Sequence, residues 1–275
     1  KPINTKKYGS VNITSATHHG HKFEPLSTYI YETMYDTTVA EYGCIESDEY
    51  HYLAASPDGI NVKIDNPRYG RLLEIKNPTS REITGIPKKE YWVQMQMQME
   101  VLNLPECDFL ETAFKEYKTE NEYLNDGEFN KTKDGKRKGI IVCFNDGSKP
   151  VYKYVPLHIN SYEEYDIWKN KIIDENNELT WIHDTFWYLE TMSCVLVRRN
   201  KIWFNAINHK FKELWNIVLN ERVNGYDHRK PKKRQKRKSV PKISITTPPL
   251  KAQQSPSIKP LKINTPSLEE TELAI

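Results

Sequence analysis

The sequence lacks any apolar run of the ~18 to 20 residues needed to cross a bilayer, and no secretory signal peptide opens it. Only four of its 275 residues are cysteine, and they form neither a C-x-x-C pair nor a zinc-ligand spacing. We therefore expect separate, reduced thiols, as is usual inside cells, at Cys44, Cys107, Cys143 and Cys194. The first residue is Lys rather than Met, from which we expect upstream sequence to be missing.

Charge is distributed unevenly along the chain. Residues 229–275 hold twelve Lys or Arg and three Glu, a net charge of +9, so the rest carries −6 of the total of +3. Eight of the ten residues in Arg229–Lys238 are basic, among them Lys232, Lys233 and Arg234. Such a run is typical of a nuclear localisation signal or of a tether that adds salt-dependent affinity for DNA. A solvated linker is the alternative.

Helical and strand patterns alternate along residues 20–157. Phe23, Leu26 and Ile30 recur at helical spacing, and a turn at residues 56–59 separates two strand-like segments that we expect to form a hairpin. The predicted helices are 20–35 and 88–102, and the predicted strands are 50–55, 60–64, 71–76, 108–114, 139–144 and 151–157. Residues 115–138 are expected to form a solvated loop, and residues 162–221 a helical region that includes a short hairpin.

This alternation predicts an α/β (α+β) fold with a central mixed β-sheet flanked by helices. We expect three parts along the chain. Residues 1–160 form the core, residues 161–228 a Trp-rich helical extension packing on the core, and residues 229–275 a disordered, basic tail rich in Pro, Ser and Thr.

Three residues suggest chemistry: Asp58 in the turn S-P-D-G, and Glu74 and Lys76 in the strand E-I-K. Alternation along a strand puts Glu74 and Lys76 on the same face. If the turn lies beside that strand, two carboxylates and the backbone carbonyl of Ile75 form an oxygen-rich site suited to Mg²⁺ or Mn²⁺. Such a metal activates water and stabilises charge on a phosphate. Asp-Gly turns and E-x-K strands are also common by chance, so spacing alone leaves both readings open.

Longer motifs carry a resemblance. Residues 55–59 are A-S-P-D-G, residues 73–78 are L-E-I-K-N-P, and residues 91–96 are Y-W-V-Q-M-Q. These blocks resemble the lambda-exonuclease family, also called the YqaJ viral recombinase family, within the PD-(D/E)XK nucleases. Residues 19–25, H-G-H-K-F-E-P, are similar to the helix of that family that ends in Glu-Pro. The resemblance covers about residues 15–160 and points to a large DNA virus.

The resemblance implies a restriction-endonuclease-like core and a Mg²⁺- or Mn²⁺-dependent exodeoxyribonuclease. Asp58, Glu74 and Lys76 would be catalytic, with Glu24 and Gln94 completing the site. The metal would be held by Asp58, Glu74, the Ile75 carbonyl and Glu24. Residues implied in DNA or phosphate binding are Ser56, Tyr91 and, more weakly, Asp48, with the basic tail as a tether.

The family implies double-stranded DNA ends as substrate, resected for recombination or repair, with a single-strand annealing protein and a homo-oligomer, a trimer in relatives, as partners. The expected location is the host nucleus or a cytoplasmic viral replication site. One departure concerns the family's N-terminal Arg motif that grips DNA, because nothing before His18 matches it well. Alternatives are an endonuclease of the same superfamily and a non-catalytic DNA-binding module. For His18, His19 and His21, we expect a polar rim of the site rather than a metal cluster.

Overall fold

A computed structural model describes residues 13–229 of the chain. The chain divides into two units, Lys1–Gly225 and Tyr226–Ile275. The first unit holds the fold described below, and of the second the structure describes a single 3₁₀ turn, η1 (Asp227–Arg229). The predicted tail, with Lys232, Lys233 and Arg234, lies outside the described residues. No helix within residues 13–229 is long and apolar enough to span a bilayer.

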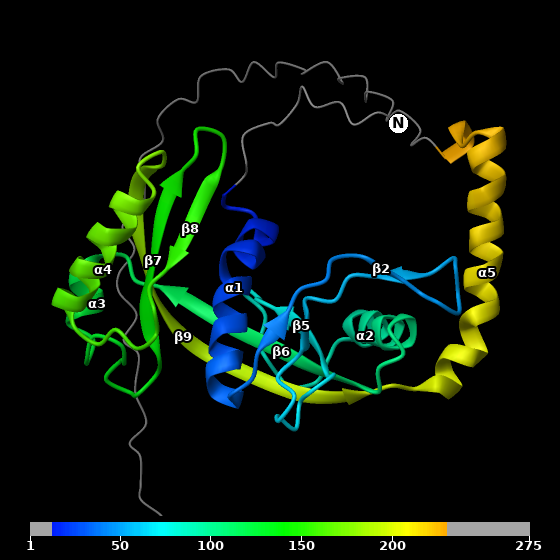
Figure 1. The fold of residues 1–275 in the computed structure, drawn as a ribbon, viewed down its shortest axis with the longest axis horizontal. Coiled ribbons are helices and arrows are strands. Elements are labelled where there is room, and N and C mark those ends of the chain that lie inside the picture. The colour runs from blue at the N-terminus through cyan, green and yellow to red at the C-terminus, as the bar shows by residue number, and fades with distance from the viewer. Residues whose placement is uncertain (1–12, 230–275) are drawn as a thin grey trace, which may run out of the picture. The chain divides into compact units, whose positions relative to one another are not determined.

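The first unit is built on a seven-stranded mixed sheet (Figure 1). β5 and β6 run parallel, whereas the other neighbouring strands are antiparallel. The order across the sheet is β1 (Val39–Ala40), β4 (Gly59–Asn61), β5 (Leu72–Lys76), β6 (Glu106–Glu116), β9 (Thr180–Arg198), β7 (Lys138–Asn145) and β8 (Pro150–Tyr154). A separate pair joins β2 (Ile45–Glu46) to β3 (Ala54–Ala55). The expected mixed sheet flanked by helices is therefore confirmed.

Helices lie against both faces of β5. On one face, α2 (Lys89–Val101) buries Met95 and Met99 in a cluster with Leu72. On the other, α1 (Ala16–Tyr35) buries Tyr31 against Leu73. The remaining helices are α3 (Glu120–Leu124), α4 (Tyr162–Glu175) and α5 (Lys201–Asn224). Burial of β5 from both sides explains why most of this strand is apolar, and it makes the buried Glu74 conspicuous.

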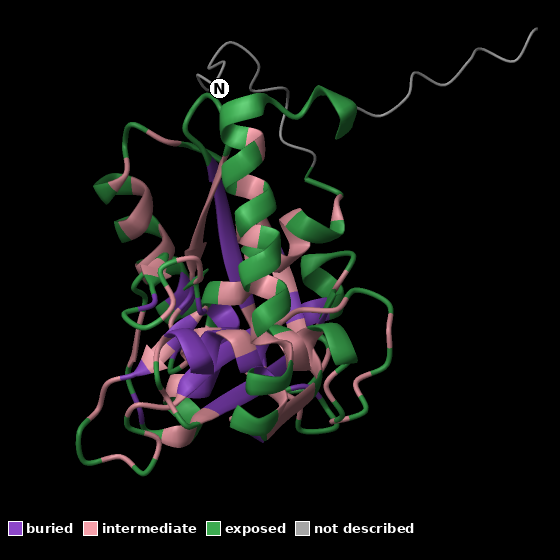
Figure 2. Ribbon diagram, turned by 90° about the vertical axis from the view of Figure 1, so that its right-hand side faces the viewer, coloured by how far each residue is buried: buried purple, intermediate pink, exposed green. Residues whose placement is uncertain are grey.

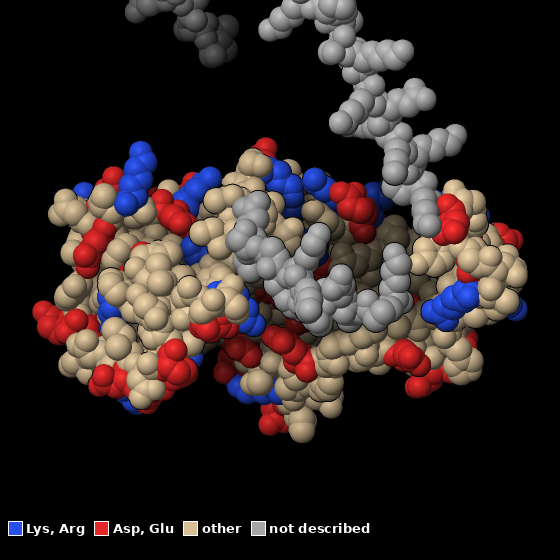
Figure 3. All heavy atoms as spheres, turned by 90° about the horizontal axis from the view of Figure 1, so that it is seen from above, with Lys and Arg blue, Asp and Glu red and all other residues tan. Residues whose placement is uncertain are grey.

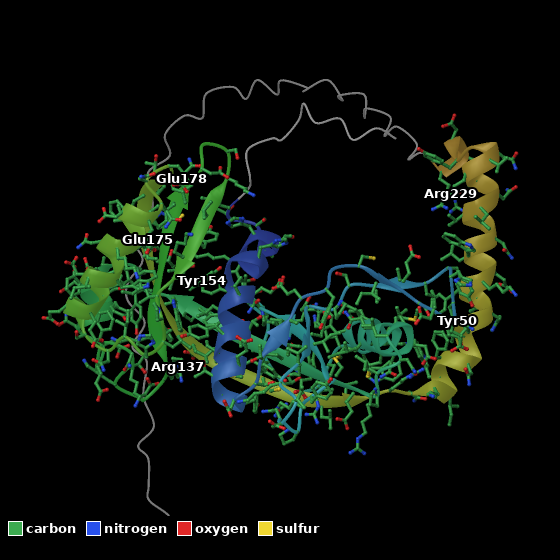
Figure 4. All side chains as sticks on the ribbon, viewed as in Figure 1. Tyr50, Arg137, Tyr154, Glu175, Glu178 and Arg229 are labelled. Carbon is green, nitrogen blue, oxygen red and sulfur yellow. The ribbon has the colours of Figure 1, made fainter. Side chains whose placement is uncertain are left out.

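α1 is fixed at several points along its length. Ser15 caps its N-terminus by accepting a hydrogen bond from the His18 N–H at 3.1 Å. Phe23 stacks on Phe114 of β6 with ring centroids 4.7 Å apart. The Tyr154 hydroxyl of β8 points toward α1 (Figure 4) and donates to the Lys22 carbonyl at 2.7 Å. These contacts hold the helix that carries Glu24 against the sheet.

Burial follows this layering. Figure 2 shows the buried residues gathered in the strands and on the inner sides of α1 and α2, whereas α5 is mostly exposed or half-buried. Phe204, near the start of α5, is its one buried residue among those described. The Tyr50 ring packs on Phe204 with centroids 5.2 Å apart. The base of α5 is thus held by the core.

Three local predictions are wrong. Residues 162–221 are not one helical region, because Thr180–Arg198 forms β9 between β6 and β7, and the expected short hairpin at 195–204 is absent from this described segment. The segments before and after residues 56–59 do not form a hairpin, since β3 pairs with β2, and β4 pairs with β1 and β5. Residues 115–138 are more than a solvated loop, because they contain α3 and the fully buried Tyr123. The division at residue 160 stays a prediction.

Candidate active site

The E-I-K segment is the last half of β5. Glu74 and Lys76 lie on the α2 face of the strand, as alternation predicts, while Leu73 and Ile75 pack in the cluster on the α1 side. The Glu74 side chain is fully buried, and one of its carboxylate oxygens forms an ion pair with the Lys76 ammonium. A buried carboxylate is costly unless it is paired and hydrogen-bonded, so Lys76 is held at this position by charge.

Asp58 reaches β5 from the turn that precedes β4. Its Oδ2 accepts a hydrogen bond from the Ile75 N–H at 2.6 Å, so the carboxyl is anchored between Glu74 and Lys76 along the strand. Burial, followed by the negative charge of Glu74, raises the pKa of Asp58 to about 7, against the opposing effects of the Ile75 hydrogen bond and Lys76. Asp58 therefore lies close enough to Glu74 for the charge of Glu74 to disfavour ionisation of the Asp58 carboxyl.

Glu24 approaches from α1. Its side chain is half-buried, and burial raises its pKa, with the negative charges of Glu41 and Glu74 adding to the rise and His21 and Lys76 opposing it. Glu24 also contributes to the raised pKa of Asp58. The structure thus brings Glu24, Asp58, Glu74 and Lys76 into one electrostatic neighbourhood.

The glutamines of α2 take different places from those expected. Gln94 is exposed, whereas Gln98 is buried one turn later and donates from Nε2 to Glu74 Oε2 at 2.8 Å. Gln96 lies on another side of the helix, where it donates to the Arg198 carbonyl and accepts from the Asn200 N–H. Gln98 is therefore the glutamine that contacts the carboxylates. Its position, four residues after Gln94 and seven after Tyr91, was the available signal in the sequence.

The expected binding residues scatter. Tyr91 lies beside the site, with the Lys76 ammonium 5.2 Å from its ring centroid. The Ser56 side chain is exposed, and its carbonyl lies 3.5 Å from Gln98 Nε2. Asp48 is exposed and lines a separate hollow with Glu49. Tyr91 thus adjoins the carboxylates, and no contact joins the Asp48 side chain to them within the described residues.

The histidines of α1 follow their own pattern. The His18 ring hydrogen-bonds the Tyr152 hydroxyl at 2.6 Å, and the His19 ring packs at a tilt against Phe23 with ring centroids 4.6 Å apart. Across residues 13–229, no three His, Cys, Asp or Glu side chains are gathered closely enough to form a metal cluster. His18 and His21 line a hollow of about 380 Å³ with Lys149 of the β7–β8 turn.

The donor chemistry nevertheless fits a divalent cation. Asp58 and Glu74 supply hard carboxylate oxygens, as Mg²⁺ and Mn²⁺ prefer. Burial and then the charge of Glu74 raise the pKa of Asp58, and a cation between the two carboxylates would offset both effects. Gln98 Oε1 is buried without a hydrogen-bond partner at the same place. Holding a cation requires the Lys76 ammonium to move off Glu74.

A polar network on the α1 side of β5 was not predicted from the sequence. The Asn77 amide donates to Ser27 Oγ at 2.7 Å and to Thr112 Oγ1 at 2.6 Å, and these two hydroxyls lie 2.7 Å apart. The network ties the residue after Lys76 to α1 and β6. No sequence signal identified it, because its members are far apart in the chain and chemically ordinary.

Comparisons with known proteins confirm the family resemblance. Residues 3–105 match the family model of the YqaJ-like viral recombinase domain, and all four motif blocks fall within that span. An uncharacterized protein of Acanthamoeba polyphaga mimivirus is 29% identical over an alignment of 245 residues, and the match covers 74% of this chain and 43% of the relative. The chain thus spans less than half the length of this curated relative, which comes from a large DNA virus.

Solved structures of an alkaline exonuclease (LHK-Exo) from Laribacter hongkongensis also align with the chain. One covers 76% of this chain and 71% of its own, with 18% identity and a TM-score of 0.42. The second, in complex with dAMP, covers 75% and 69%, with the same identity and TM-score.

Proposed function

We propose that this chain is a metal-dependent deoxyribonuclease that resects the ends of double-stranded DNA. The observation that carries the proposal is the meeting of Asp58 and Glu74 beside Lys76, with Asp58 hydrogen-bonded to the Ile75 N–H. The match of residues 3–105 to the YqaJ-like viral recombinase domain supports it independently. The proposed reaction is hydrolysis of a phosphodiester bond by water.

Each residue has a proposed task. Asp58 and Glu74 would hold the cation, helped by the Ile75 carbonyl and by Glu24. Such a cation, when bound, lowers the pKa of a water and offsets charge on the phosphate. Lys76 would donate hydrogen bonds to the phosphate oxygens as negative charge grows on them. Gln98 would keep Glu74 in one orientation by donating to Oε2.

The finer parts of the proposal concern specificity. We assign Mg²⁺ or Mn²⁺ as the metal, DNA ends as the substrate, and recombination, repair or processing of a viral genome as the role. A single-strand annealing protein and a homo-oligomer are the proposed partners. These assignments rest on the family resemblance, whereas the carboxylates and Lys76 rest on geometry as well.

A non-catalytic DNA-binding module is the second candidate. The ion pair between Lys76 and Glu74 favours it, because the ammonium occupies an oxygen that a metal would need. Binding of Mg²⁺ separates the two candidates directly. In a nuclease, the site should bind the ion, and Lys76 should separate from Glu74. In a non-catalytic module, the ion pair between Lys76 and Glu74 should persist, and Mg²⁺ should cause no change.

The experiment that tests the proposal compares linear with covalently closed circular duplex DNA in Mg²⁺. An exonuclease degrades the linear DNA and leaves the circle intact. Cleavage of both at similar rates would identify an endonuclease that uses the same residues. Absence of cleavage of either DNA, in Mg²⁺ and in Mn²⁺, would refute a nuclease function.

A further inference from the structure

A hollow opens beside Lys76, where β5 ends. Its volume is about 380 Å³, and the segment between β5 and α2 forms most of its wall. Lys76 connects it to the active site, because the same side chain lines the hollow and pairs with Glu74. The polar residues of its lining are Lys76, Asn77, Thr79, Ser80, Arg81, Lys88 and Tyr91.

The charge of this hollow is one-sided. The cations Lys76, Arg81 and Lys88 line it, and no Asp or Glu is among its lining residues within the described chain. Lys76 and Arg81 are also paired with carboxylates outside the lining, Glu74 and Glu111. Lys88 is exposed and stands at the N-terminus of α2, which no side chain caps. The positive end of the helix dipole adds to the attraction for an anion. The hollow is therefore suited to a negatively charged group.

Arg81 is fixed by a buried carboxylate. One oxygen of Glu111, whose side chain is 2% exposed, pairs with Arg81 Nη2, and the other oxygen is buried without a hydrogen-bond partner. The guanidinium carbon lies 5.5 Å from the centroid of the Tyr91 ring. The Glu111 carboxylate holds the guanidinium on one side, and the Tyr91 ring lies next to it. The remaining N–H donors of Arg81 therefore point in a defined direction.

Glu111 also sets where Arg81 stands relative to the active site. In the parallel pairing of β5 with β6, Glu111 is the register partner of Lys76. Register partners on neighbouring strands share a face of the sheet, so both charged side chains lie on the α2 side. The anchor of Arg81 is thus one strand away from the lysine of the proposed catalytic site.

We propose that this hollow binds an internal backbone phosphate of the DNA strand, next to the phosphodiester that is cleaved, with Arg81 as the principal contact and Glu111 as its positioning residue. The inference rests on the proposed function for the identity of the ligand. The guanidinium fork, the serine and threonine hydroxyls and the lysines match the geometry and charge of phosphate oxygens. Arg81 therefore sets the register of the strand relative to Asp58 and Glu74.

The test is binding of metal-free protein, in EDTA, to fluorescein-labelled duplexes that each carry one neutral methylphosphonate near the end. Wild type should lose affinity at one position, by about 5- to 20-fold. Arg81→Gln should bind unmodified duplex more weakly by a similar factor and should be insensitive to the modification at that position. Its salt dependence should fall by about one phosphate contact. Glu111→Gln should weaken binding by about threefold.

Controls separate a local effect from misfolding. Arg81→Gln leaves Glu111 buried without its cation, so the double variant Arg81→Gln/Glu111→Gln, which removes both charges, must show the same insensitivity. Arg198→Gln is the matched control, since Arg198 is 80% exposed and lies five residues along the strand pairing from Glu111, roughly 17 Å away. It should retain the wild-type profile.

Two outcomes overturn the proposal. One is an Arg81→Gln profile with the same sensitive position and the same loss as wild type. The other is that wild type and Arg81→Gln differ in their response to removal of the 5′-terminal phosphate but to no internal methylphosphonate, which would assign the hollow to the DNA terminus. The assay measures binding and does not depend on cleavage. A wild-type protein that cleaves no DNA, but whose sensitivity to the methylphosphonate is lost in Arg81→Gln, would refute the nuclease proposal and support the phosphate site.

Discussion

At the scale of single residues, Asp58 is the most informative group of the site. Its carboxyl is anchored by the Ile75 N–H, yet burial and the charge of Glu74 raise its pKa to about 7. A raised pKa means that the folded protein binds the proton more tightly than the unfolded chain, whose Asp titrates near 4. Stability therefore decreases as pH rises from about 4 to about 7 and stays at the lower value above that.

Asp58→Asn should remove this penalty. An amide oxygen can still accept from the Ile75 N–H, so the metal-free variant should be more stable than wild type at pH 8, by about 1 to 3 kcal/mol. The difference should shrink toward zero at pH 4. Urea unfolding in EDTA at the two pH values measures it. Equal differences at both pH values would contradict the origin assigned to the shift.

Two of the three glutamines of α2, Gln94 and Gln98, give a matched pair. Gln98 donates to Glu74 Oε2, whereas Gln94 is exposed. Gln98→Ala should lower kcat or metal affinity by about 10- to 100-fold, in the range found for groups that orient metal ligands. Gln94→Ala should change either by less than about twofold. Steady-state cleavage of linear duplex at several Mg²⁺ concentrations checks this, and the reverse ranking would restore Gln94 to the role that the family motif implies.

At the scale of elements, β5 and the segment after it organise the site. β5 presents Glu74 and Lys76 to one face, and Asn77 turns to the other face to bond Ser27 and Thr112. Those hydroxyls belong to α1 and β6, so a single amide joins three elements just behind Lys76. The orientation of the lysine thus depends on packing between elements as well as on strand alternation.

Asn77→Ala should expose how much this junction contributes. Two partly buried hydrogen bonds disappear, but Ser27 and Thr112 retain each other, so the free energy of unfolding should fall by about 1 to 3 kcal/mol. Asn125→Ala is the control, because its side chain bonds only within the exposed end of α3, and it should stay within about 0.5 kcal/mol of wild type. A loss in Asn77→Ala no larger than that of the control would contradict a structural junction.

The local spacing of apolar residues predicted the helix and strand that carry the motifs. It failed for a strand whose pairing partners are distant in the sequence. Residues 71–76 and 88–102 were expected as a strand and a helix, and β5 and α2 lie there, because amphipathic spacing is a local property. Thr180–Arg198 was expected to be helical, yet it pairs with β6 and β7. Its strand state depends on partners 35 to 50 residues earlier in β7 and 71 to 92 residues earlier in β6, which no local window contains.

The candidate site was likewise predicted only where short motifs identify its residues. Asp58, Glu74 and Lys76 were identified from short motifs, and their convergence depends on β4 lying antiparallel to β5. The expected hairpin between 50–55 and 60–64 was the wrong pairing, although it put Asp58 in the right turn. The contact of Gln98 with Glu74 and the ion pair of Arg81 with Glu111 could be identified only from the structure. The face of a helix and the register of a strand decide which polar side chain contacts which carboxylate.

At the scale of the whole molecule, charge offers little guidance to the binding face. Acidic and basic side chains intermingle over the surface seen in Figure 3, rather than separating into one broad basic area there. Lys76, Arg81 and Lys88 gather around one hollow, so the proposed contact with DNA is expected beside the proposed catalytic residues.

The central claim is tested most directly by a time course on end-labelled linear duplex with Mg²⁺, comparing wild type with Glu74→Gln. The change keeps the size of the side chain and its contact with Gln98 while removing the charge that a cation needs. Wild type should release label progressively from the end, EDTA should stop the reaction, and Glu74→Gln should be slower by at least about 10³-fold. Wild-type protein that releases no label in Mg²⁺, or releases it at the rate of Glu74→Gln, would contradict the account.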